Sequence, residues 1–126
     1  MTIKYQYLKP SKYDVALNPK LNGLCITIAT DLVQNSEKQS TCFWVVAFKN
    51  PKDQFVKAEA RKVIAHRADN DVTWQGKFAV SNKYTRNELL VKILMELHIR
   101  EYDMTTPYVQ YVRWLLADSS FTDYLV

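Results

Sequence analysis

The sequence has few of the residues on which most catalytic and metal sites depend. In 126 residues glycine occurs only as Gly23 and Gly76, and histidine only as His66 and His98. Two glycines cannot build a phosphate-cradling loop or a dinucleotide fingerprint, because each needs several closely spaced glycines. Neither histidine has a spacing typical of a metal site or of a nucleophile and its base. We therefore predict a protein with no enzymatic activity, no metal and no cofactor.

Cysteine and long apolar segments are equally scarce. Cys25 and Cys42 fall in separate strand-like runs, and the sequence leaves open whether they lie near each other. Without a secretory signal, two cysteines are more often reduced and buried than joined. No run reaches the roughly 18 apolar residues that a membrane span needs, and the first residues lack the apolar core of a signal peptide. We expect a cytoplasmic protein that does not enter a membrane.

What the sequence does contain predicts one α+β domain over residues 1–126, in the order β-β-β-α-β-α-α. Polar and apolar residues alternate over 3–7, large aliphatic residues alternate with smaller ones over 24–29, and an apolar run covers 42–48. The last two runs, joined by a polar stretch, predict a hairpin, while the segment from Lys9 to Asn22 reads as a loop. Because 43–48 is apolar at every position, we expect it mid-sheet and covered on both faces. A fourth strand is predicted over 72–80, with Gly76 as a bulge.

Three helix starts can be identified from capping signals. Asn50-Pro51 predicts a helix from Pro51 to about Ala68, because Asn caps and Pro suits the first helical position. Thr85 followed by Glu88 matches a capping box and predicts a helix over 86–102. That helix is apolar on most of its circumference, so it belongs to the core or to a homodimer interface. Thr106-Pro107 predicts a last helix with one apolar face, made by Tyr108, Tyr111, Val112 and Leu115.

Positive charge is concentrated in residues 41–67. Six cations stand there against Asp53 and Glu59, so the net charge of this segment, +4, equals that of the whole chain. Lys57 and Arg61 are four residues apart on one helix face, and the small neighbours Ala58 and Ala65 are expected to leave them unobstructed. We predict the partner-binding residues to be Lys49, Lys52, Lys57, Arg61, Lys62 and Arg67. A solvated face that maintains solubility is the alternative reading.

One segment resembles a short element of a known group of proteins. Residues 48–55, Phe-Lys-Asn-Pro-Lys-Asp-Gln-Phe, continue through Ala60-Arg61 to Ala65-His66-Arg67. This stretch is similar to an element of small uncharacterised bacteriophage proteins, in which an apolar strand leads into a helix with spaced Arg, Ala and Arg. That helix usually carries Gly-Arg where this chain has Ala60-Arg61. The resemblance covers about 20 residues and implies a small accessory protein that acts in the host cell cytoplasm.

These observations together predict a non-catalytic binding protein. The leading hypothesis is an inhibitor or adaptor, phage-encoded if the resemblance holds, that acts on a host defence or nucleic-acid-handling complex. Its partner would be a host protein or a protein–nucleic acid complex. The alternative is direct binding of RNA or DNA through the same basic helix, and a small enzyme is a distant third. Salt dependence separates the first two, because phosphate contacts weaken steeply with salt whatever the nucleic acid.

Overall fold

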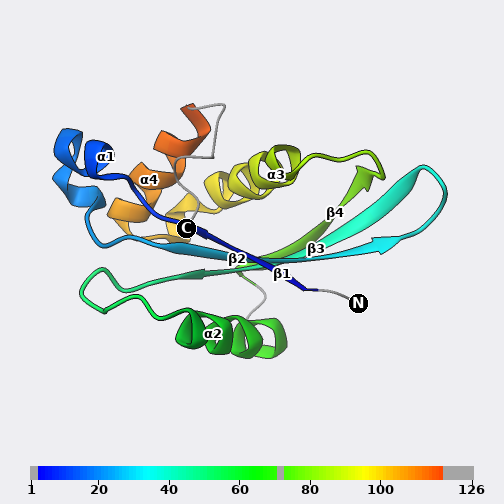
Figure 1. Ribbon diagram of the computed structural model, residues 1–126, viewed down its shortest axis with the longest axis horizontal. Helices are drawn as coiled ribbons and strands as arrows, with labels where there is room; N and C mark the ends of the chain where they lie inside the picture. The colour runs from blue at the N-terminus through cyan, green and yellow to red at the C-terminus, as the bar shows by residue number, and fades with distance from the viewer. Residues whose placement is uncertain (1–2, 71–72, 118–126) are drawn as a thin grey trace.

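A four-stranded antiparallel sheet with strands in the order β1-β2-β3-β4 forms the centre of the fold (Figure 1). The computed structural model describes residues 3–70 and 73–117. Each strand pairs with the next along the chain, so the sheet is a simple meander. The predicted α+β class and antiparallel sheet are confirmed. The strands are β1 (Lys4–Leu8), β2 (Ile26–Gln34), β3 (Gln39–Phe48) and β4 (Gln75–Ser81).

Helices lie on both faces of the sheet but cover them unequally. One face carries three α-helices, and among the described helices only α2 lies on the other (Figure 1). The larger core is on the three-helix face, where Ile26, Ile28 and Trp44 of the sheet pack with leucines of α3. The helices are α1 (Lys12–Leu17), α2 (Lys57–Asn70), α3 (Arg86–Ile99) and α4 (Thr106–Ala117), with 3₁₀ turns η1 (Pro19–Leu21) and η2 (Glu101–Asp103).

Helices α3 and α4 follow the sequence prediction closely. The backbone N–H of Glu88 donates to the Thr85 hydroxyl at 3.2 Å, which caps α3 where expected. Five apolar side chains of α3 are buried, while Met95 and Ile99 remain 54% and 68% exposed. All four residues of the predicted apolar face of α4 are buried. Both helices therefore have one face in the core.

Long-range polar contacts fasten α4 to the N-terminal third of the chain. The indole N–H of Trp114 donates to Asp14 in α1 at 3.2 Å, across 100 residues of sequence. The Cys25 backbone N–H donates to the buried Tyr108 hydroxyl at 3.1 Å, across 83 residues. Burial raises the pKa of Tyr108 well above its usual range. The same hydroxyl donates to the Lys49 carbonyl oxygen, so one buried side chain joins α4 to the segments before β2 and after β3.

The predicted helix start at Pro51 is wrong, because Asn50-Pro51 forms a turn and α2 begins at Lys57. The Asn50 side-chain oxygen accepts from the Lys52 backbone N–H at 3.0 Å, and its carbonyl accepts from the Asp53 N–H at 3.0 Å. Asn stabilises turns by this contact as readily as it caps helices. Gly23 supports the turn: it has φ of 80°, and a Cβ there would lie 2.6 Å from the Pro51 carbonyl oxygen.

Three further expectations need correction. Gly76 is no bulge, since it pairs in register with Trp44, and a Cβ at Gly76 would lie 2.8 Å from the indole ring. The segment from Lys9 to Asn22 is not a plain loop, because it contains α1 and η1. Phe43 is 43% exposed, so β3 is covered on both faces only beyond this residue. Val72, assigned to the fourth strand, lies outside the described residues, and β4 begins at Gln75.

Candidate basic binding surface

The six predicted cations do not form one continuous patch. Lys49, at the end of β3, donates through Nζ to the carbonyl oxygens of Asn50 and Asp53. Lys62 faces solvent and pairs with Glu59 at 3.4 Å. Lys52 is exposed in the turn before α2, and Arg67 is half-buried in the last turns of α2. Of the six, Lys57 and Arg61 lie over rings of the same strand, and Lys49 lines the pocket beside α2.

Lys57 and Arg61 are exposed, as expected, but each also lies against an aromatic ring of the sheet. The Arg61 Nε–H donates to the Tyr7 hydroxyl at 3.1 Å, and its Cζ lies 5.0 Å from the centre of the Tyr5 ring. Lys57 Nζ lies 5.0 Å from the centre of the Tyr7 ring. These are cation–π distances. The two cations are thus held in defined positions over β1.

Lys9 and Phe55 extend this arrangement at the N-terminal end of α2. The Phe55 ring meets the Tyr7 ring edge to face, with centroids 5.4 Å apart. Lys9 Nζ lies 3.9 Å from the Phe55 ring centre. Cations and rings form two layers, which we call the cation–aromatic strip: Lys9, Lys57 and Arg61 over Phe55, Tyr7 and Tyr5.

The three cations of the strip are not neutralised within the described part of the chain. No carboxylate there forms an ion pair with Lys9, Lys57 or Arg61. Three neighbouring positive charges repel one another, and a bound anion would relieve this repulsion. Because the rings already hold the cationic side chains in place, less side-chain entropy is lost when an anion binds. An arrangement of this kind is suited to binding carboxylates or phosphates.

A pocket of about 490 Å³ opens on the other flank of α2, toward β3. Apolar atoms of Ala47 on the sheet and of Val56, Ala60 and Val63 line it. Asp53 and Glu59 stand among its lining residues, and both are exposed. Phe55 belongs to the wall of this pocket as well as to the strip, so the two features are continuous.

Sequence reasoning missed Lys9, Phe55 and the two tyrosines of the strip. The alternation at the N-terminus does predict that Tyr5 and Tyr7 share a sheet face. It does not reveal that this face meets α2, since Tyr7 and Arg61 are 54 residues apart.

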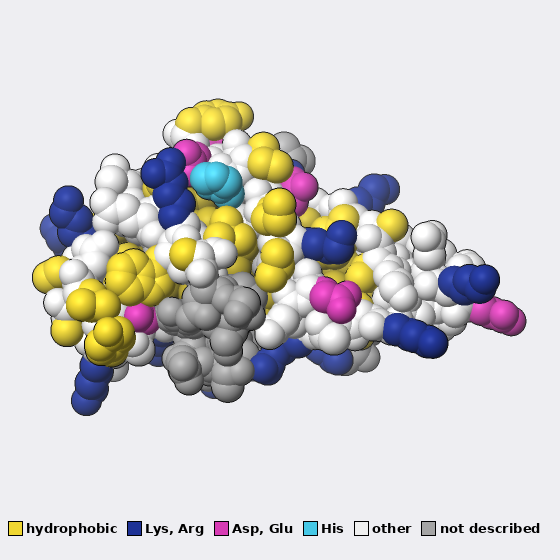
Figure 2. All heavy atoms as spheres, turned by 90° about the horizontal axis from the view of Figure 1, so that it is seen from above, with side chains coloured by type: hydrophobic (Ala, Val, Ile, Leu, Met, Phe, Trp, Pro, Cys, Tyr) yellow, Lys and Arg dark blue, Asp and Glu magenta, His cyan; other side chains and the backbone are white. Residues whose placement is uncertain are grey.

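Figure 2 views the opposite side of the molecule, that of the three helices. There, charged side chains of both signs are interspersed and no basic area gathers.

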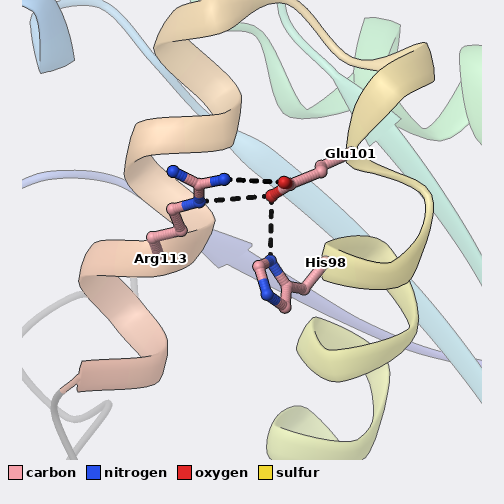
Figure 3. Close-up of polar contacts among 3 residues, drawn as sticks. All are labelled: His98, Glu101 and Arg113. Atoms are coloured by element: carbon pink, nitrogen blue, oxygen red, sulfur yellow. Dashed lines mark hydrogen bonds and ion pairs between the residues drawn. The ribbon is translucent and has the colours of Figure 1, made fainter.

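A second polar cluster joins the ends of α3 and α4 (Figure 3). The Arg113 guanidinium donates twice to Glu101, at 2.6 and 3.2 Å, and His98 Nδ1 lies 2.9 Å from the same carboxylate. The hydrogen bonds from Arg113 are the largest cause of a lowered pKa of Glu101. A carboxylate already held by arginine is a weak base, so this cluster is better suited to joining two helices than to proton transfer.

Both cysteines are poorly suited to act as nucleophiles. Cys25 and Cys42 are free and buried, and desolvation raises the pKa of each thiol to about 11. A thiol with such a pKa carries almost no thiolate at neutral pH. Among the described residues there is no group of His, Cys, Asp and Glu arranged to hold a metal ion. Within that same part of the chain, no helix is both long and apolar enough to cross a membrane.

Comparisons of the chain with protein-family models, with curated proteins and with solved structures gave no match.

Proposed function

We propose that this protein is a non-catalytic binding protein, and that its cation–aromatic strip binds an acidic surface of another protein. The observation that carries the proposal is the un-neutralised row of Lys9, Lys57 and Arg61 over ordered rings. Side chains that are already ordered in this way lose little further conformational entropy when they bind a partner. The fold thereby presents a ready-made cationic contact surface.

The surroundings of the strip favour a protein over a nucleic acid. Tyr7 is only 4% exposed beneath its cations, so its ring cannot serve as a stacking platform for a base. The carboxylates of Asp53 and Glu59 would repel a phosphate backbone that passed the N-terminal half of α2. Charged groups next to an apolar pocket are instead typical of a protein–protein interface.

The resemblance of residues 48–67 to phage accessory proteins adds a biological setting to this proposal. An accessory protein of about this size would act as an inhibitor or adaptor, binding a host defence or nucleic-acid-handling complex and blocking it. The binding surface in our proposal does not depend on that setting.

Affinity capture from a lysate of the cell in which the protein acts tests the proposal. Three baits are compared: the wild type, a strip variant (Lys9→Gln with Lys57→Gln), and a control of equal charge loss (Lys38→Gln with Lys83→Gln). The two control lysines are exposed and lie in the β2–β3 and β4–α3 connections, at the end of the sheet opposite Lys9. We expect one specific protein to be retained by wild type and control after nuclease treatment, and to be lost from the strip variant.

Two results contradict the proposal. If the strip variant retains the partner as well as the control does, the strip is a solvated face. If nuclease releases everything that the wild type captures, and binding falls steeply with salt for any sequence, the protein binds nucleic acid directly.

A further inference from the structure

The pocket beside α2 exists because small side chains face each other across the two layers. Ala47 on the sheet and Ala60 on the helix line the pocket, and beside it Ala29 and Ala47 pack against Ile64. Of the described α2 side chains only Ile64 is buried. Larger side chains at the alanines would have filled the space, as protein interiors normally are filled. The interface between α2 and the sheet is therefore closed at Ile64 and open toward the N-terminal end of the helix.

Apolar walls remain in contact with water as a result. Val56 and Val63 line the pocket, yet they are 47% and 41% exposed. Burying such surface is favourable, and a concave apolar site of about 490 Å³ is within the range of pockets that bind ligands, about 300–1,000 Å³. An incoming apolar group would find the site already formed.

The pocket and the strip share Phe55 and adjoin each other around the N-terminus of α2. We propose that the pocket receives an aromatic side chain of the same acidic protein segment that the strip binds. This inference rests on the proposed function and adds to it the kind of sequence recognised. A central apolar anchor with charged contacts around it is the usual arrangement of binding hot spots.

The charges at the pocket set the order of residues in the partner. Two carboxylates, Asp53 and Glu59, line the pocket against one cation, Lys49, whose Nζ already donates to the carbonyl oxygens of Asn50 and Asp53. The surplus of negative charge favours neutral or basic residues directly around the anchor. The acidic residues belong on the strip side, over Lys9 and Lys57. The recognised segment is thus an acidic run, a short neutral spacer and an aromatic residue.

Synthetic peptides provide the test without knowledge of the natural partner. One peptide carries four glutamates, a Gly-Ser spacer and a tryptophan amide, and a second has alanine in place of the tryptophan. We expect the wild type to bind the tryptophan peptide at least about tenfold more tightly, as measured by isothermal titration calorimetry. Ala60→Phe fills the pocket and should remove this preference, whereas Ala58→Phe, on the exposed face of the same helix, should keep it.

The outcomes separate this inference from the proposed function. If the wild type binds the tryptophan peptide and the alanine peptide with equal affinity, the pocket is not an anchor site. The same conclusion follows if neither peptide binds at millimolar concentration. If Lys9→Gln with Lys57→Gln leaves both affinities unchanged, the role of the strip fails whatever the pocket does. If Ala60→Phe does not fold, Val63→Gln replaces it, because this change makes the exposed wall of the pocket polar. We expect Val63→Gln to reduce the preference for the tryptophan peptide. An undiminished preference in Val63→Gln overturns the inference.

Discussion

Replacing Arg61 by alanine should destabilise the fold measurably, although Arg61 is largely exposed. The side chain donates to the Tyr7 hydroxyl at 3.1 Å and lies 5.0 Å from the centre of the Tyr5 ring. A hydrogen bond of this kind contributes about 1 kcal/mol, and a cation–π contact at an exposed site about 0.5–1 kcal/mol. We expect Arg61→Ala to lower the free energy of unfolding by about 1.5–2 kcal/mol.

Urea denaturation followed by circular dichroism measures this change. A double-mutant cycle with Tyr7→Phe isolates the hydrogen bond, and the coupling should be about 1 kcal/mol. Lys62→Ala is the matched control on the same helix: its side chain is 75% exposed and pairs only with Glu59, so its effect should stay within about 0.5 kcal/mol. If Arg61→Ala costs no more than Lys62→Ala, Arg61 does not hold α2 on β1, and the strip is not pre-organised.

Two further predictions concern titratable groups. Because burial raises the pKa of Cys25 and Cys42 to about 11, both thiols should resist alkylation at pH 8 until the protein is unfolded. Rapid alkylation of the native protein would contradict this prediction. The free energy that the two protonated thiols contribute to stability should be present below the ordinary thiol pKa of 9.0 and be lost as the pH rises from there toward 11. For Glu101, whose pKa Arg113 lowers, carboxyl NMR should show a midpoint below that of an ordinary glutamate and an upward shift in Arg113→Ala. The stability that this pair contributes should be present above the ordinary carboxyl pKa and be lost as the pH falls through the lowered value; an unchanged midpoint in the variant would argue against the pair.

The sequence predicts elements well where local signals act alone. Thr85 has both a capping hydroxyl and a following apolar helix, and α3 begins there. The apolar spacing from Tyr108 to Leu115 fixes the buried face of α4 by itself. Asn50-Pro51 shows the limit, since the same two residues suit a turn or a helix start. The choice is made by tertiary contacts of Phe55 with Tyr7 and of Pro51 with Gly23.

The candidate site was less accessible to sequence reasoning than the fold. Charge concentration drew attention to α2, but it could not tell which cations share a surface. Lys57 and Arg61 turn toward β1, while Lys62 turns to solvent. Lys9 lies outside the basic segment altogether and joins the strip through Phe55. Such groupings depend on contacts between residues about 50 positions apart, which no local pattern encodes.

The contacts that fasten α4 to α1 and β2 have a consequence for the order in which the chain folds. Every strand pairs with its neighbour in sequence, so the meander can form by successive short-range steps. The contacts of Trp114 with Asp14 and of Tyr108 with Cys25 close loops of 100 and 83 residues. During synthesis they cannot form until α4 has left the ribosome. The nascent chain therefore leaves the part of the three-helix sheet face that α4 covers exposed until α4 arrives, and this interval is when it is most open to aggregation or to a chaperone.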